Sequence, residues 1–146
     1  MNTHESSSDF SKLVQTFFCE RLINQQDVSS RTVTAYRDTF RLLFRFIEKR
    51  DGCLPDHITL AHLNANLIVD FLNYLEQDRG NCIRTRNARL AAIRSFFQFA
   101  SLEVPDCLSL VNRVLAIPMK RFDHPSIRYL TREEIEALIA APNHQT

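Results

Sequence analysis

Hydrophobic residues recur every three or four positions through most of the chain, a spacing that predicts amphipathic α-helices. Serine or asparagine precedes several of these runs as an N-cap, and Gly52 and Gly80 follow two of them, where a left-handed C-terminal cap favours glycine. The predicted helices run from about Asp9 to Gln25 with Ser7 or Ser8 as cap, from the Ser29-Ser30 cap to near Gly52, from the Asn64 cap to Gly80, from Ile83 to Leu102, and, as a shorter piece, from Asp106 to about Ala116.

A last helix is predicted to open at 131 to 132 and to end before Pro142. The run Thr131-Arg132-Glu133-Glu134 has the form of a capping box, and Ile135, Leu138 and Ile139 make a hydrophobic stripe with nothing after it to pack on. Before this helix, Pro118 and Pro125 bracket a basic stretch, Met119 to Tyr129, that is predicted to be an extended linker. We therefore expect the sequence to stop just inside a second domain.

Composition favours one all-α domain. The chain has 146 residues and two glycines, too few for the tight turns of a many-stranded sheet. No hydrophobic run approaches the roughly 18 residues of a membrane span, and the polar N-terminus does not resemble a signal peptide, so a soluble, cytoplasmic protein without a membrane partner is expected. The four cysteines, Cys19, Cys53, Cys82 and Cys107, are too widely spaced for a metal site and are expected to be reduced and mostly buried.

The net charge of +1 hides alternating charged blocks. Residues 31–50 carry +4, residues 51–78 carry −5, residues 79–102 carry +5 with no acid, and residues 118–132 carry +3. If the basic segments share one side of the fold, their surface would attract a polyanion despite the near-neutral total.

The fourth helix has two unlike faces. Leu90, Ile93, Phe97 and Ala100, with Phe96 beside them, form the predicted core face, and Arg86 and Arg89 fall on its flank, reaching phosphates at best. The opposite face has no acid and several small residues, which allow a close approach to a DNA groove, while arginine and asparagine suit phosphates and base edges. A helix packed against another helix would have a similar composition. The residues of this face are Arg84, Asn87, Ala88, Ala91, Arg94, Ser95 and Gln98.

On the second helix, Arg37, Arg41 and Arg45 recur every four residues, with Thr34 one turn earlier. Such a stripe suits a phosphate backbone, and a plain solvated face explains it equally well. For a DNA-binding surface, the stripes of the two helices must converge on the same side of the bundle.

Signs of catalysis are absent from the sequence. His57 and His62 lack a third ligand for a metal, and Tyr36, Tyr74 and Tyr129 lack a neighbouring base or cation cluster that would mark a nucleophile. No metal, no cofactor and no catalytic residue are expected, and the chain alone is not expected to be an enzyme.

Two segments resemble the N-terminal core-binding domain of tyrosine recombinases of the phage integrase and Xer type. They are Ser29-Ser30-Arg31-Thr32-Val33 through Tyr36 to Phe44-Arg45-Phe46-Ile47, and Thr85-Arg86-Asn87-Ala88-Arg89-Leu90-Ala91-Ala92-Ile93-Arg94-Ser95-Phe96-Phe97. The runs Ile117-Pro118-Met119-Lys120-Arg121 and Tyr129-Leu130-Thr131-Arg132-Glu133-Glu134-Ile135 are similar to that family's interdomain linker and the start of its catalytic domain. The resemblance covers nearly all of residues 8 to 142.

The resemblance implies a four-helix, SAM-like bundle that clamps one side of double-stranded DNA through its second and fourth helices. It divides the chain into a core-binding domain (8–116), a basic linker (117–130) and the start of a truncated catalytic domain (131–146). Family members cut DNA through a tyrosine and act as tetramers, and this fragment is expected to be a monomer. The DNA contacts that the resemblance implies are Arg84, Asn87, Ala91 and Arg94, with Thr34, Arg37 and Arg41 on the second helix and Lys120 and Arg121 in the linker.

The leading hypothesis is therefore the DNA-binding module of a site-specific recombinase or transposon integrase. The alternative is a helical protein-interaction module that pairs its oppositely charged surfaces. A complete recombinase within 146 residues would need a nucleophile and a cationic pocket that the sequence does not show.

Overall fold

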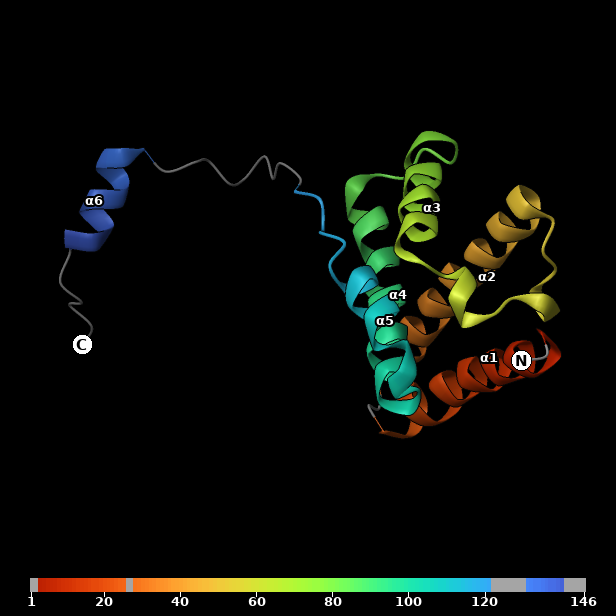
Figure 1. The fold of residues 1–146 in the computed structure, drawn as a ribbon. Coiled ribbons are helices and arrows are strands. Elements are labelled where there is room, and N and C mark those ends of the chain that lie inside the picture. Colours follow the sequence, from red (N-terminus) through yellow and green to blue (C-terminus); the bar gives the residue numbers. More distant parts are fainter. Residues whose placement is uncertain (1–2, 26–27, 122–130, 141–146) are drawn as a thin grey trace.

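The computed structural model of the protein describes residues 3–25, 28–121 and 131–140, and within these ranges it holds helices and no strand (Figure 1). This confirms the all-α class. The helices are α1 (Thr3–Thr16), a π-helix η1 (Phe17–Gln25), α2 (Ser30–Asp51), the short 3₁₀ turns η2 (Pro55–His57) and η3 (Leu60–His62), α3 (Ala65–Gln77), α4 (Ile83–Glu103), a 3₁₀ turn η4 (Pro105–Cys107), α5 (Leu108–Leu115) and α6 (Arg132–Ala140).

The predicted caps fix the ends of the central helices. The Ser29 hydroxyl accepts a 3.2 Å hydrogen bond from the Thr32 amide at the start of α2, and the Asn64 side chain accepts one of 2.9 Å from Leu67 at the start of α3. Gly52 ends α2 with φ +68° and donates its amide to the Glu48 carbonyl at 2.8 Å. Side chains that satisfy the free amides of the first turn thus stabilise both starts, as expected from the sequence.

Replacing Gly52 with alanine should destabilise the protein by about 1 kcal/mol, because an L-residue with positive φ is strained. A methyl group at this position would meet nothing within 4 Å, so the cost comes from the backbone conformation alone. Urea unfolding measures the loss, and Gly52→Asn, which tolerates this conformation better, should lose less. Equal losses for the two variants would contradict the explanation.

The start of the first helix was predicted wrongly. The helix begins at Thr3 rather than near Asp9, so Ser7 and Ser8 lie within α1 and cannot be its N-cap. From Phe17 the helix continues as the π-helix η1 up to Gln25, where the predicted helix also ended.

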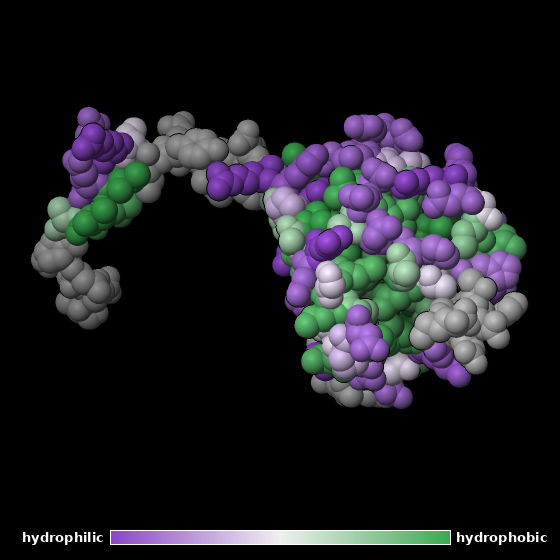
Figure 2. Space-filling model, in the orientation of Figure 1, coloured by the Kyte–Doolittle hydropathy of each residue, from purple (hydrophilic) through white to green (hydrophobic). Residues whose placement is uncertain are grey.

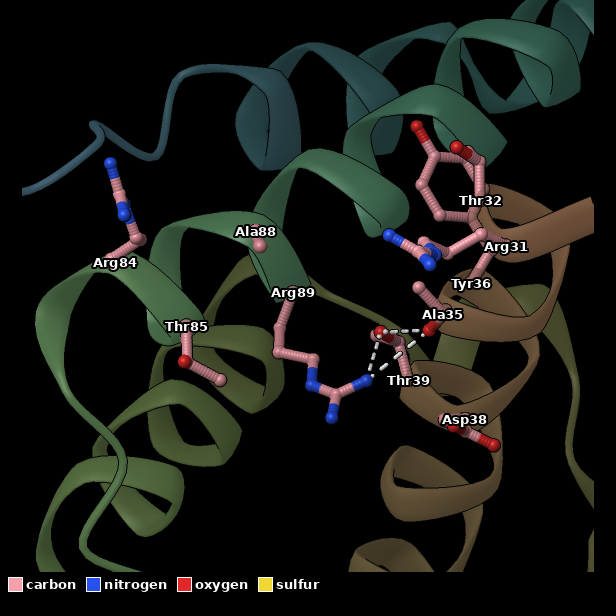
Figure 3. A pocket seen from close by; sticks show the side chains of 10 residues that line it. All are labelled: Arg31, Thr32, Ala35, Tyr36, Asp38, Thr39, Arg84, Thr85, Ala88 and Arg89. Atoms are coloured by element: carbon pink, nitrogen blue, oxygen red, sulfur yellow. Dashed lines mark hydrogen bonds between the residues drawn. The ribbon is translucent and has the colours of Figure 1, made fainter. Parts of the chain in front are cut away.

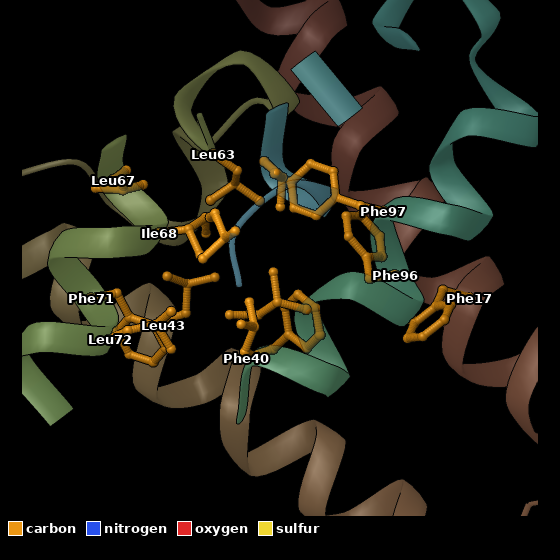
Figure 4. Close-up of a cluster of buried hydrophobic side chains, with 14 of the residues drawn as sticks. Phe17, Phe40, Leu43, Leu63, Leu67, Ile68, Phe71, Leu72, Phe96 and Phe97 are labelled. Carbon is orange, nitrogen blue, oxygen red and sulfur yellow. The ribbon is translucent and has the colours of Figure 1, made fainter. Parts of the chain in front are cut away.

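The core is built around α4, which contacts α1, α2, α3 and α5. Leu90, Ile93, Phe96, Phe97 and Ala100 are all buried, which confirms the predicted core face of this helix. Phenylalanine rings from η1, α2 and α4 meet at its centre, and leucine and isoleucine from α2, α3 and the residue that follows η3 extend the cluster (Figure 4). The labelled members are Phe17, Phe40, Leu43, Leu63, Leu67, Ile68, Phe71, Leu72, Phe96 and Phe97.

The cysteines depart from expectation. All four are free, but Cys19 and Cys82 are exposed and Cys53 and Cys107 are half-buried, so the expectation of mostly buried thiols is wrong. Hydrogen bonds with Thr85 lower the pKa of the Cys82 thiol, whereas burial raises the pKa of Cys107.

The C-terminal helix keeps its predicted start. Thr131 accepts a hydrogen bond from the Glu134 amide at 3.2 Å, and Glu134 accepts one from the Thr131 amide at 2.8 Å, which completes the capping box. Every residue of α6 is exposed, and Figure 2 shows its hydrophobic side chains along one side. Of the predicted extended linker, residues 122–130 lie outside the described part of the chain. None of the described helices is long and hydrophobic enough to cross a membrane.

Candidate nucleic-acid interface

A groove of about 430 Å³ runs between the first half of α2 and the first turns of α4 (Figure 3). Its wall on α4 carries Arg84, Thr85, Ala88 and Arg89. The α2 wall carries Arg31, Thr32, Ala35, Tyr36, Asp38 and Thr39. Three arginines therefore line a groove in which Asp38 is the only acid among the ten lining residues.

Arg89 joins the two walls of this groove. Its Nη1 donates to the Ala35 carbonyl at 3.2 Å and to the Thr39 hydroxyl at 3.0 Å, so the side chain reaches from α4 to α2 (Figure 3). The Thr39 hydroxyl in turn donates to the Ala35 carbonyl at 3.0 Å. Arg89 is half-buried and its Nε has no partner among the described residues. Arg89 lies on the flank of the core face, and its hydrogen bonds connect α4 to α2.

The basic stripe predicted on α2 lies outside this groove. Thr34, Arg37 and Arg41 are all exposed, and none of them lines it. Arg37 lies about 160° around the helix from the groove residue Ala35, and Arg41 about 120°, because each residue turns the helix by about 100°. The residue of α2 that brings a positive charge to the groove is Arg31, which does not belong to the predicted stripe.

The residues predicted on α4 lie on one side of that helix and range from half-buried to exposed. Arg84 is exposed and lines the groove, while Ala91 and Arg94 are half-buried further along the helix. Of the nine predicted contacts, Arg84 is the one that the structure places in the groove itself. Asn87 is half-buried, and its side chain is hydrogen-bonded to Lys120, which belongs to the linker.

The start of the linker is held by contacts among Glu76, Arg86, Asn87 and Lys120. We call this set of contacts the latch. The Asn87 side chain donates to the Lys120 carbonyl at 2.8 Å and accepts from the Lys120 amide at 3.0 Å. Arg86 Nη1 donates to the Pro118 carbonyl at 3.1 Å and to Asn87 Oδ1 at 3.0 Å. Lys120 Nζ lies 2.7 Å from Glu76 Oε2, and Arg121, which follows, is exposed.

The prediction that Arg86 lies on a phosphate-reaching flank is wrong. Its relative exposure is 6%, and its Nε lies 3.9 Å from Glu76 Oε1. Burial lowers the pKa of the Arg86 guanidinium, and the carboxylate of Glu76 opposes that shift. The sequence placed Arg86 near the core correctly, but it could not show that the chain after α5 returns to cover this side chain.

The described residues contain no group of three or more histidine, cysteine or acidic side chains that could hold a metal ion. His62 instead accepts a hydrogen bond from the Thr59 amide at 3.0 Å and caps the short helix η3.

Comparison with known proteins gives a consistent set of relatives. The family model described as phage integrase, N-terminal SAM-like domain, matches residues 16–103. A protein of Sinorhizobium fredii named an integrase/recombinase, y4rC, is 45% identical over 92% of this chain and 40% of its own length. A second such protein of that organism, y4rD, is 42% identical over 92% of this chain and 48% of its own length. The tyrosine recombinase XerC of Caldanaerobacter subterraneus is 26% identical over 76% of this chain and 35% of its own length.

The chain thus spans less than half the length of these curated relatives. No solved structure matches it significantly.

Proposed function

Because the chain belongs to the family of phage integrase N-terminal SAM-like domains, we propose that it binds double-stranded DNA as the DNA-binding module of a site-specific tyrosine recombinase. The observation that carries this proposal is the groove between α2 and α4, where Arg31, Arg84 and Arg89 gather beside small residues. Arginines attract the phosphate backbone, and small side chains let it approach the helices closely.

The proposal also assigns each segment of the chain to a part of the recombinase. Residues 8–116 form the core-binding domain, residues 117–130 the basic linker, and residues 131–146 the start of the catalytic domain. Strand cleavage through a tyrosine and assembly into a tetramer on DNA belong to a longer recombinase. In that recombinase this chain is the N-terminal domain, which binds one side of the DNA. The exposed hydrophobic stripe of α6, with Ile135, Leu138 and Ile139, supports this division, since such a stripe normally packs inside a domain.

Reversing the charge of Arg84 and Arg94 together should abolish the mobility shift of duplex DNA by the 146-residue chain at low salt. Each reversal removes a cation from the exposed side of α4 and adds an anion there. With alanine in place of both arginines, which leaves binding to titrate, the steepness of log affinity against log salt should decrease by about 2 if each arginine neutralises one phosphate. Helical circular dichroism should remain unchanged.

The matched control is Lys12→Glu with Arg113→Glu, which changes the net charge equally. Lys12 lies on α1 and Arg113 on α5, both are exposed, and neither lines the groove. This control should retain the shift. An unchanged shift in the Arg84 and Arg94 variant would refute DNA binding through α4, and equal losses in both variants would show that only net charge matters.

A protein-interaction module is the second candidate, since residues 51–78 carry −5 beside basic neighbours. Much of that acidic block is neutralised within the chain. Asp51 and Asp70 both pair with Arg50, at 3.5 and 2.9 Å, and Glu76 pairs with Lys120. Self-association at low salt without DNA binding would favour this second candidate over the first.

A further inference from the structure

The start of the linker is held to α4 by its backbone. Asn87 makes two hydrogen bonds to the backbone of one residue, Lys120, while Arg86 holds the Pro118 carbonyl two residues earlier. Backbone groups of residues 118 and 120 are therefore fixed from two adjacent residues of one helix. Such paired bonds define the direction of a chain better than side-chain packing alone, because each has a preferred geometry.

The bonds of Asn87 also limit what this side chain can do elsewhere. A base edge in a DNA groove is read by an amide that donates and accepts at the same time. Here the donor and the acceptor of the Asn87 amide are both bonded to Lys120, at 2.8 and 3.0 Å. The Asn87 Oδ1 also accepts from Arg86, so a contact that both donates to and accepts from a base would require this oxygen to give up one of its two donors.

The latch also decides where the linker cations lie. Asn87 stands one turn after Arg84 and one turn before Ala91 on the exposed side of α4, so the backbone at Lys120 lies beside the same surface. The Lys120 side chain is 45% exposed and its ammonium is bound to Glu76 on α3, and Arg121 follows as an exposed residue. Arg121 thereby adds an exposed cation beside the arginines of α4, while the pair with Glu76 holds Lys120 at the start of the linker.

We infer that Asn87 is a positioning residue: through the latch it holds Lys120 and Arg121 beside α4, where Arg121 binds the phosphate backbone, and it does not read a base itself. This inference rests on the proposed function, because it assigns the linker cations to the same DNA surface. Arg86 supports the latch by holding Pro118, and Glu76 orients the Lys120 side chain.

Hydrogen exchange in the free 146-residue protein tests whether the latch exists. Asn87→Ala removes the acceptor of the Lys120 amide, whose exchange should become at least about tenfold faster, while amides in the middle of α4 keep their protection. Gln77→Ala is the control, since it removes an exposed amide side chain next to Glu76 that makes no hydrogen bond to the described part of the linker. An unchanged exchange rate at Lys120 in Asn87→Ala would overturn the inference without DNA being involved.

A double-mutant cycle on duplex DNA tests the positioning role. Asn87→Ala should weaken binding about three- to tenfold in the unaltered chain and have almost no effect in a chain that already carries Lys120→Ala and Arg121→Ala. A loss of the same size in both backgrounds would mean that Asn87 contacts DNA directly and would overturn the inference. If the unaltered chain binds no DNA, the proposed function fails and the positioning role fails with it, whereas the exchange result still decides whether the latch exists.

Discussion

Replacing Phe96 with alanine is expected to remove about 3 to 5 kcal/mol of stability, a large part of the total of a domain of this size. Phe96 is completely buried, and its ring meets four others. The centroids lie 6.1 Å from Phe10, 5.5 Å from Phe17, 5.3 Å from Phe40 and 5.5 Å from Phe97, all in edge-to-face arrangements. These rings come from α1, η1, α2 and α4, so a cavity here loosens three helical segments from the central helix at once.

Urea unfolding followed by circular dichroism measures this loss, and Tm should fall by more than about 10 °C. Leu102→Ala is the matched control on the same helix. Leu102 is 67% exposed, so its truncation should change stability by no more than about 0.5 kcal/mol. A loss below about 1 kcal/mol for Phe96→Ala would contradict the packing described for this ring.

The sequence predicted the helices well where a cap residue and a hydrophobic period agree. The Ser29 and Asn64 caps, the Gly52 end of α2 and the Thr131 capping box all occur where they were expected. These signals are local, since each depends on bonds between residues three or four apart. The start of the first helix was predicted less well because the serines before Asp9 resemble cap residues, whereas the helix begins at Thr3 and includes them.

The candidate site was predicted only in part, because a groove depends on how two helices face each other. Periodicity identified the exposed side of α4, including Arg84, from that helix alone. On α2 it selected the stripe with Arg37 and Arg41, while the side that faces α4 carries Arg31 and Ala35. Ala35 and Ala88 are both exposed in this groove, and the pattern of a single helix does not show that Ala35 lies on the same side as α4.

The latch could not be predicted from any local pattern. Asn87 and Lys120 are 33 residues apart, and Glu76 and Lys120 are 44 apart. Asn87 and Arg86 were interpreted from their place on a helical wheel, which describes one helix and ignores the chain that returns after α5. The buried Arg86 next to the half-buried Asn87 is explained only by the contacts of both side chains with the linker.

Replacing Arg86 with methionine is expected to cost about 2 to 3 kcal/mol in the free energy of unfolding. Methionine keeps a long hydrophobic side chain in the buried space but removes the donor to the Pro118 carbonyl. It also removes the cation nearest to Glu76 Oε1, a buried oxygen without a hydrogen-bond partner among the described residues. Lys120 remains 2.7 Å from the other oxygen of Glu76, which keeps the cost below that of a fully unpaired carboxylate.

A second substitution at Glu76 separates the two contributions. In a Glu76→Gln background the buried charge is gone, so Arg86→Met should cost at least about 0.5 kcal/mol less than in the unaltered chain. Arg113→Met removes an exposed arginine from α5 and should change stability by no more than about 0.5 kcal/mol. If Arg86→Met costs the same in both backgrounds, its role is confined to the Pro118 carbonyl. An unpaired buried charge is costly, whereas an exposed one is not. A smaller cost of Arg86→Met in the Glu76→Gln background would therefore show that the Arg86 guanidinium stabilises both the linker start and α3.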